Sequence, residues 1–250
     1  METIIYEKKG QVAYVTLNRP DKLNAMNDVM HRELGEAWAD FRDDDTLRVA
    51  ILSGNGRCFS AGADLSAGAP EKYTYTGEFP DISQTQKVYK PIISALHSHV
   101  VGYGLWIALD ADIRIATEDT SFWLPEPQWG IATIPCAWFP KIMPWAIASE
   151  LLLLAERVSA QRAYDLGLIN QVVASGGALE AAKAMAAKIA ANGPMAIAAS
   201  KAVVDRAQDW STDVMYAQQD KIIQPVFTSE DAIEGATAFA EKRAPNWKGK

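Results

Sequence analysis

Two short turns of small residues hold the groups in this sequence that are best suited to chemistry. The first is Phe-Ser-Ala-Gly-Ala-Asp-Leu at residues 59–65, and the second is Val-Gly-Tyr-Gly at residues 101–104. Each stands where a predicted strand passes into a helix or a loop. Glycine lets the backbone bend sharply and lets a ligand approach the main chain, so such turns can direct peptide N–H groups outward. Two converging N–H groups would form an oxyanion hole, although either turn alone is also typical of an ordinary tight connection.

Glu126 is the side chain with the most suitable surroundings for proton transfer. It lies in an apolar stretch between Leu124 and Trp129, with a proline on each side. Partial burial there should raise the pKa of its carboxyl towards the working pH, as a general base requires. The alternative interpretation is a carboxylate that caps a helix or lies on the surface.

The elements that must position these groups alternate between strands and helices. Residues 12–17 predict a strand, an amphipathic helix should follow from Asn27, and residues 49–52 predict a strand buried on both faces. A second unit repeats this order, with a strand at 92–96, a helix at 103–109 and a strand at 113–116. Residues 66–90 indicate a variable loop with at most one helix, and the last quarter of the chain is mostly helical. The fold class is therefore α/β.

Composition limits the kinds of partner. The 250 residues are 49% hydrophobic and carry a net charge of −7, which predicts one main domain and argues against a nucleic-acid partner. The two cysteines, Cys58 and Cys136, and three histidines predict neither a disulfide framework nor a metal site. Without a basic, apolar leader or a run of about 20 apolar residues, we expect a cytoplasmic protein that does not bind membranes.

Several motifs in register resemble one family. They are Asn-Arg-Pro-Asp-Lys-Leu-Asn-Ala-Met at 18–26, Phe-Ser-Ala-Gly-Ala-Asp-Leu at 59–65, Lys-Pro-Ile-Ile through Gly-Tyr-Gly over 90–104, Asp-Ile-Arg-Ile-Ala at 112–116, Pro-Glu at 125–126 and Phe-Ala-Glu-Lys-Arg at 239–243. In order and spacing the chain resembles the crotonase superfamily, also called the enoyl-CoA hydratase/isomerases. The resemblance implies a spiral of repeated ββα units over residues 1–192. It also implies a C-terminal helical region at 193–250 that assembles a homotrimer or a dimer of trimers.

The resemblance also implies roles for particular residues. The shared chemistry is stabilisation of a thioester enolate, and the N–H groups of Ala63 and Tyr103 would be the two oxyanion donors. The coenzyme A thioester would be a substrate, with no permanently bound cofactor. The residues implied in its binding are Lys22, Leu23, Ala25, Ala61, Asp64, Leu65, Phe239 and Lys242. The last two would come from the same chain or from a neighbouring subunit. A solvated basic tail is the alternative for Lys242.

The sequence departs from a two-glutamate hydratase at one position. Glu126 matches the second catalytic glutamate of the family, but Trp106 occupies the position of the first. An indole has one N–H donor and no basic site, so it cannot take a proton from water. The resemblance therefore favours an isomerase or an atypical hydratase, acting in fatty acid metabolism. A decarboxylase or hydrolase of a CoA thioester and a non-catalytic acyl-CoA-binding member are alternatives, whereas Ile107 disfavours a dinucleotide-binding site.

Other polar side chains near the second turn have less specific interpretations. Asp110 lies one helical turn after Trp106, and a structural partner such as Arg114 is favoured over a catalytic role. His97 and His99 are expected to be hydrogen-bonded core residues, with proton transfer in the pocket as the alternative. Cys136 and Trp138 should narrow the acyl pocket or change the course of its wall, because relatives often carry a glycine-rich turn there.

Overall fold

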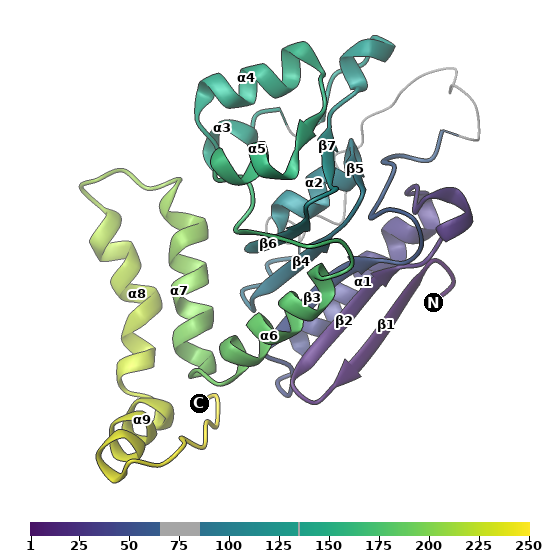
Figure 1. Cartoon of the computed structure of the whole chain (residues 1–250). Helices are drawn as coiled ribbons and strands as arrows, with labels where there is room; N and C mark the ends of the chain where they lie inside the picture. Colours follow the sequence, from purple (N-terminus) through teal and green to yellow (C-terminus); the bar gives the residue numbers. More distant parts are fainter. Residues whose placement is uncertain (66–85, 135) are drawn as a thin grey trace.

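A six-stranded sheet is the centre of the molecule (Figure 1). The computed structural model describes residues 1–65, 86–134 and 136–250. In spatial order the strands are β1 (Ile4–Lys9), β2 (Val12–Leu17), β3 (Val49–Gly54), β4 (Ile92–Leu96), β6 (Ile113–Thr117) and β9 (Gln171–Val173). Among the described strands of this sheet, β1 and β2 pair antiparallel and all other neighbours pair parallel.

A second, smaller sheet lies beside the first. It contains β5 (His99–Val101), β7 (Ser121–Trp123) and β8 (Val158–Ser159). Ser60 forms a parallel bridge to Val100 and extends this sheet on the other side of β5. The chain thus alternates between the two sheets, and helix α2 (Tyr103–Asp110) carries it from β5 back to β6. This is the predicted spiral of ββα units.

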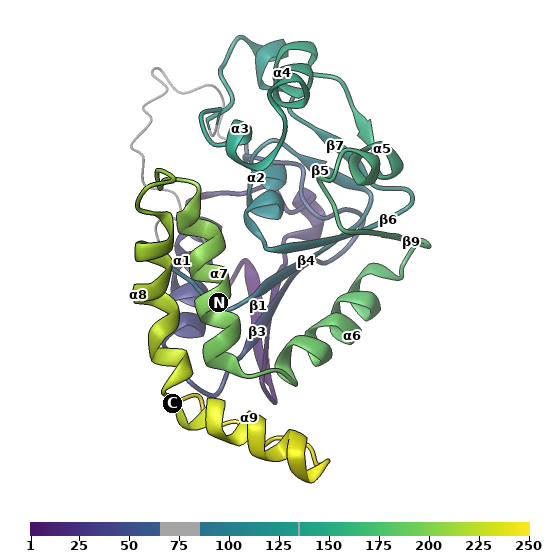
Figure 2. The ribbon, with the colours of Figure 1, turned by 90° about the vertical axis from the view of Figure 1, so that its left-hand side faces the viewer.

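Helices cover both faces of the main sheet. Alternate side chains of a strand point to opposite faces, and Ala13, Val15 and Leu17 of β2 face the core that contains α1 (Asp28–Asp43). On the other face, Val49, Ile51 and their neighbours pack against the alanines of α6 (Ala178–Ala190). Helix α6 contacts β3, β4 and β6, and Figure 2 shows it on one side of the sheet.

The remaining helices form two groups. The short helices α3 (Phe139–Ile142), α4 (Trp145–Leu154) and α5 (Ala160–Asp165) lie near β7 and β8, with the 3-10 helices η1 (Pro20–Lys22) and η2 (Glu126–Trp129) at turns. Helices α7 (Pro194–Ala207), α8 (Met215–Phe227) and α9 (Glu230–Glu241) form an arm beside the sheet (Figures 1 and 2). Lys201 of α7 holds the arm to the body through Asp112, at 2.7 Å.

The predicted elements are all present among the described residues, but several strands were missed. The strands at 12–17, 49–52, 92–96 and 113–116, the helix after Asn27 and the helix after Gly102 are all present. Strand β1 and the short strands β5, β7, β8 and β9 lie outside the predicted ranges. The expected helix within 66–90 falls largely outside the described residues, and residues 86–90 contain no helix. In the described ranges, no helix combines the length and apolar character that crossing a membrane requires.

Candidate active site

The two turns predicted from the sequence lie side by side. The Ser60 N–H donates to the His99 carbonyl at 3.1 Å, and the Val101 N–H donates to the Ser60 carbonyl at 3.0 Å. A Cβ atom on Gly104 would come within 2.6 Å of the Ser60 Cβ, so this close approach of α2 to the first turn requires glycine. The pairing brings residues 59–65 and 101–104 to one site.

The first turn also pairs with the segment after η1. The Ala61 N–H donates to the Leu23 carbonyl, the Met26 N–H to the Gly62 carbonyl and the Asp64 N–H to the Met26 carbonyl. Six of the predicted coenzyme A-binding residues therefore lie in one group. They are Lys22, Leu23, Ala25, Ala61, Asp64 and Leu65.

Two residues that the sequence interpretation did not select hold this group together. The fully buried Asn24 has a φ of 52° and donates from Nδ2 to the carbonyls of Asn55, Cys58 and Phe59. Arg19 forms an ion pair with Asp64 at 2.8 Å, where both side chains are largely buried. The Asp64 carboxylate is thus part of a structural ion pair. Both residues lie in the motif at 18–26. Their partners Asn55, Cys58, Phe59 and Asp64 are more than 30 positions away in the chain, so the neighbouring sequence does not indicate these contacts.

The two turns meet in front of Glu126. Gly62 and Gly102 have φ values of +95° and +52°. A Cβ on Gly62 would lie 2.9 Å from the Val101 carbonyl oxygen, and one on Gly102 would lie 2.8 Å from Oε1 of Glu126. The carboxylate therefore lies over the second turn, at the distance where it could reach a substrate atom bound between the turns.

Most main-chain N–H groups of the two turns are used in hydrogen bonds that hold the fold together. The N–H groups on either side of Ala63 are bonded to Ser60 Oγ and to the Met26 carbonyl. Within the described chain, the Ala63 N–H itself makes no hydrogen bond. Tyr103 is the first residue of α2, where N–H groups have no acceptor inside the helix and the helix dipole favours negative charge.

Burial raises the pKa of the Glu126 carboxyl, as predicted from its apolar neighbours. Its own N–H and the hydroxyl of Thr133 oppose the increase by stabilising the charged form. Thr133 Oγ1 lies 3.3 Å from Oε2. A carboxylate with a raised pKa is well suited to accept and return a proton.

Trp106 fills the space beside the second turn. It is 8% exposed, and its ring lies 5.0 Å from that of Tyr103 at 81°, an edge-to-face contact. On the other side of Tyr103 is the His31 ring, at 4.7 Å, and burial lowers the pKa of that histidine. Trp106 therefore belongs to an aromatic cluster with Tyr103 and His31.

Phe239 and Lys242 lie far from the other predicted residues. They are at the end of α9, whereas the turns and Glu126 are at the opposite end of the molecule, near α2, β5 and β7 (Figure 1). Phe239 is 88% exposed. These two residues do not reach the site of their own chain, so any contribution to a site must be made to another copy.

The remaining predictions are resolved residue by residue. Arg114 lies near Asp110 and donates to the Leu109 carbonyl at 2.9 Å, in keeping with a structural role for this region. His97 and His99 are hydrogen-bonded, to the Gly56 carbonyl and to Ser121 Oγ, but they are half-buried and exposed, so the expectation of core residues was wrong.

Cys136 and the tryptophans occupy separate positions. The thiol of Cys136 is exposed and donates to the Thr133 carbonyl. Trp123 packs against Trp129, and Trp138 packs against Phe139.

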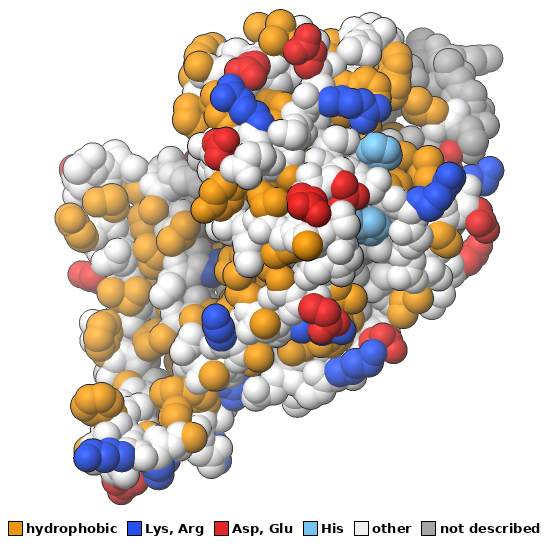
Figure 3. Space-filling model, viewed as in Figure 1, with side chains coloured by type: hydrophobic (Ala, Val, Ile, Leu, Met, Phe, Trp, Pro, Cys, Tyr) orange, Lys and Arg blue, Asp and Glu red, His pale blue; other side chains and the backbone are white. Residues whose placement is uncertain are grey.

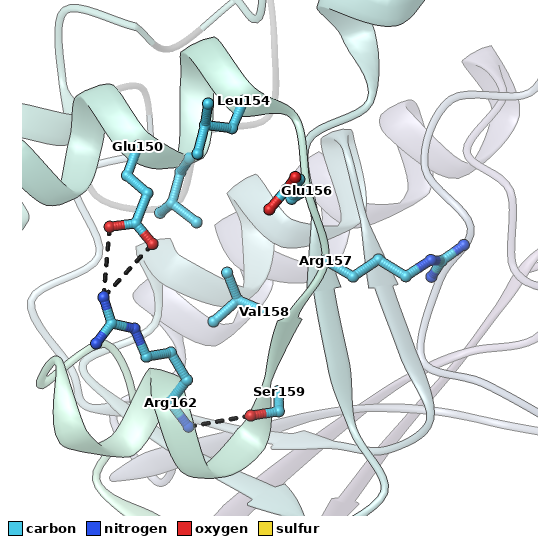
Figure 4. A pocket seen from close by; sticks show the side chains of 8 residues that line it. Glu150, Leu154, Glu156, Arg157, Val158, Ser159 and Arg162 are labelled. Carbon is cyan, nitrogen blue, oxygen red and sulfur yellow. Dashed lines mark hydrogen bonds and ion pairs between the residues drawn. The ribbon is translucent and has the colours of Figure 1, made fainter.

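A different pocket lies between α4, β8 and α5. It has a volume of about 240 Å³, and Arg162 reaches across it to Glu150 at 3.3 Å (Figure 4). None of the predicted site residues lines it. In the described ranges, no group of three or more metal-ligating side chains is assembled.

Comparison with known proteins gives one family. Residues 7–250 match the model of the enoyl-CoA hydratase/isomerase family. The carnitinyl-CoA dehydratase of Proteus mirabilis is 38% identical over 255 residues, which cover 97% of each protein. That of Salmonella typhi is 37% identical over 262 residues, covering 100% of this chain and 99% of the relative.

Solved structures give the same result. The enoyl-CoA hydratase of Mycobacterium tuberculosis H37Rv matches with a TM-score of 0.93 and 40% identity, over the full length of both chains. An enoyl-CoA hydratase of Mycobacterium marinum matches with a TM-score of 0.92 and 38% identity, again over both full lengths. With the fold and the motifs in agreement, this chain belongs to the enoyl-CoA hydratase/isomerase family, the crotonase superfamily.

Proposed function

We propose that this protein is an enzyme that binds an acyl-CoA thioester, stabilises its enolate between the Ala63 and Tyr103 N–H groups, and transfers a proton with Glu126. The observation that carries the proposal is the 2.8 Å approach of Glu126 Oε1 to the position of a Cβ on Gly102. This approach brings Glu126, the carboxylate that matches a catalytic glutamate of the family, to the turn that would hold the thioester oxygen.

The physical reason for this pairing is charge. Removing a proton from the carbon next to a thioester carbonyl moves negative charge to the carbonyl oxygen. Two fixed N–H donors, one of them at the N-terminus of α2, would stabilise that charge without reorganisation. A buried carboxylate with a raised pKa can then hold the proton and return it.

The side chain at position 106 favours isomerisation over hydration. Addition of water needs a second group that orients and activates the water, and the indole of Trp106 offers no basic site for this. Its ring also packs against Tyr103, next to the turn that would hold the thioester oxygen. A single carboxylate can still shuttle one proton between two carbons of an enoyl thioester.

Dehydration of a hydroxyacyl-CoA is the second candidate. It is supported by the relatives at 36–38% identity that are named carnitinyl-CoA dehydratases. In this reaction Glu126 would have to take the proton from the carbon next to the carbonyl and also donate a proton to the leaving hydroxyl. That double role makes dehydration or hydration slower than isomerisation.

Coenzyme A would bind along the group at 22–25 and 61–65, and a neighbouring subunit would complete the site with Phe239 and Lys242. Support comes from the exposed apolar side chains of the arm, which Figure 3 shows on its outer sides. They are Val204, Tyr216, Phe227, Ile233 and Phe239, each at least 68% exposed. Apolar patches of this kind mark subunit interfaces, and we infer a homotrimer or a dimer of trimers.

Isotope uptake tests the function. A panel of 2-enoyl-, 3-enoyl-, 3-hydroxyacyl- and malonyl-type CoA thioesters is incubated in deuterated or ¹⁸O-labelled water and analysed by mass spectrometry. We expect deuterium uptake with a shifted double bond and little ¹⁸O, and a loss of about 10²-fold or more in kcat for Glu126→Gln. Glu156→Gln, on an exposed side chain, is the control. Turnover that survives Glu126→Gln, or binding without any turnover, contradicts the proposal.

A further inference from the structure

The two oxygens of the Glu126 carboxylate have different surroundings. Oε1 lies over Gly102, facing the region where the two turns meet. Oε2 points the other way and accepts a hydrogen bond from the Thr133 hydroxyl at 3.3 Å. Thr133 thus holds Oε2, whereas Oε1 lies against Gly102 at the meeting point of the two turns.

Thr133 is well suited to hold a carboxylate in place. It is only 4% exposed, so its hydroxyl has little access to competing water. The segment that carries it folds back on η2, because the Ile131 N–H donates to the Glu126 carbonyl at 3.2 Å. The Cys136 thiol then donates to the Thr133 carbonyl and closes the turn that follows.

We propose that Thr133 is a positioning residue that fixes Oε2 of Glu126, so that Oε1 is the oxygen that exchanges the proton with the substrate. The inference deepens the proposed function and rests on it for the role of Oε1. A free carboxylate can rotate and present either oxygen, whereas one anchored at Oε2 presents Oε1 in a single orientation. Fixing the orientation in the ground state removes an entropic cost from proton transfer.

The hydroxyl also sets the proton affinity of Glu126. A donor to the carboxylate stabilises its charged form and keeps its pKa lower than burial alone would give. The nearby Cys136 thiol carries no charge near pH 7, because partial desolvation of the thiol and the charge of Glu126 both raise its pKa. Loss of the Thr133 hydroxyl should therefore raise the pKa of Glu126.

Thr133→Val tests this, because it keeps the shape of the side chain and removes the hydroxyl. We expect kcat to fall about tenfold with KM nearly unchanged, and the acid limb of the kcat/KM profile to move upward by about one pH unit. Thr133→Ser keeps the hydroxyl and should recover most of kcat and the original acid limb. Thr46→Val removes a surface hydroxyl that donates to Asp44 at 2.6 Å and serves as the matched control.

A direct titration separates this inference from the proposed function. The pKa of Glu126 is measured by carbon NMR of ¹³C-labelled glutamate in the substrate-free protein, with the signal assigned from Glu126→Gln. A higher pKa in Thr133→Val supports the hydrogen bond whatever the activity. An unchanged pKa and acid limb, or equal losses in the Val and Ser variants, overturns the inference. Turnover that survives Glu126→Gln overturns the proposed function instead.

Discussion

At the scale of single residues, the site depends on glycine where two backbones and a carboxylate meet. Gly102 has φ +52° and ψ −120°, a conformation that side chains strongly disfavour. It also leaves room for Glu126 Oε1, which lies 2.8 Å from the place a Cβ would take. Two separate requirements, backbone conformation and space, thus fall on one residue.

Gly102→Ala should therefore damage catalysis more than stability. The added methyl would push the Glu126 carboxylate away from the turn, and we expect kcat to fall about 10²-fold, because small displacements of reacting groups cost this much. Gly176→Ala, at φ +80° with nothing within 4 Å, measures the effect of backbone strain alone. Kinetics and thermal unfolding of both variants are compared. Equal activity of Gly102→Ala and Gly176→Ala would show that Gly102 is needed for its backbone conformation and not for the space it leaves to Glu126.

The site residues could be predicted from the sequence to different degrees. Glu126 stands out because its apolar neighbours are adjacent in the chain, and the two turns stand out because their glycines are clustered. Thr133 does not, because nothing in its neighbourhood indicates that its hydroxyl faces Glu126. The residues that were missed act through contacts with residues distant in the chain or across a folded loop, and such contacts leave no pattern in the local sequence.

At the scale of elements, strand β1 shows why some strands cannot be predicted from the pattern of hydrophobic residues. β1 runs Ile-Ile-Tyr-Glu-Lys-Lys and is mostly exposed along one edge of the sheet. Charged residues, especially lysine, protect such edges from pairing with other chains, and they also remove the hydrophobic alternation that predicts a strand. β3 and β4, buried on both faces, show continuous apolar runs and were predicted from them.

A buried carboxylate of α1 holds the start of β1 in place. Glu33 is 6% exposed and accepts hydrogen bonds from the Thr3 hydroxyl and from the N–H groups of Glu2, Thr3 and Ile4. Burial alone would raise its pKa, but these four donors outweigh burial and lower the pKa to about 2. The folded protein therefore stabilises the ionised form of Glu33 more than the unfolded chain does.

Glu33→Gln should lower the free energy of unfolding by about 2 kcal/mol at pH 7, since the four donors lose a charged acceptor. Because the folded pKa lies below the ordinary value of 4.5, the stabilisation is complete above about pH 5 and is lost as the pH falls towards 2. Urea unfolding from pH 7 to pH 3 should thus show the wild type and the variant converging. Glu36→Gln, exposed on the same helix, should change little at any pH, and a constant gap for Glu33→Gln would contradict the assignment.

At the scale of the whole molecule, the spiral and the arm have different tasks. The spiral gathers residues 19–26, 59–65, 101–106 and 126–133 at one end, because each ββα unit returns the chain to the same edge. The arm carries α9 to the opposite end, with Phe239 and Lys242 exposed there. A single chain therefore cannot bring its own Lys242 to its own Glu126.

If Lys242 of one subunit binds the phosphates of coenzyme A at its neighbour, removing its charge should weaken substrate binding and leave the chemistry intact. We expect Lys242→Ala to raise KM about fivefold with kcat unchanged, and to reduce the salt dependence of KM. Lys221→Ala, on the exposed side of α8, is the control.

Mixed oligomers give the sharper test, because Glu126→Gln chains still carry Lys242 and Lys242→Ala chains still carry Glu126. Co-assembly of the two should create some sites that contain both groups, one from each subunit. These sites should turn over substrate with the KM of the wild type. A mixture that shows only the raised KM of Lys242→Ala would mean that each lysine acts on its own chain or on none, and the arm would then serve assembly alone.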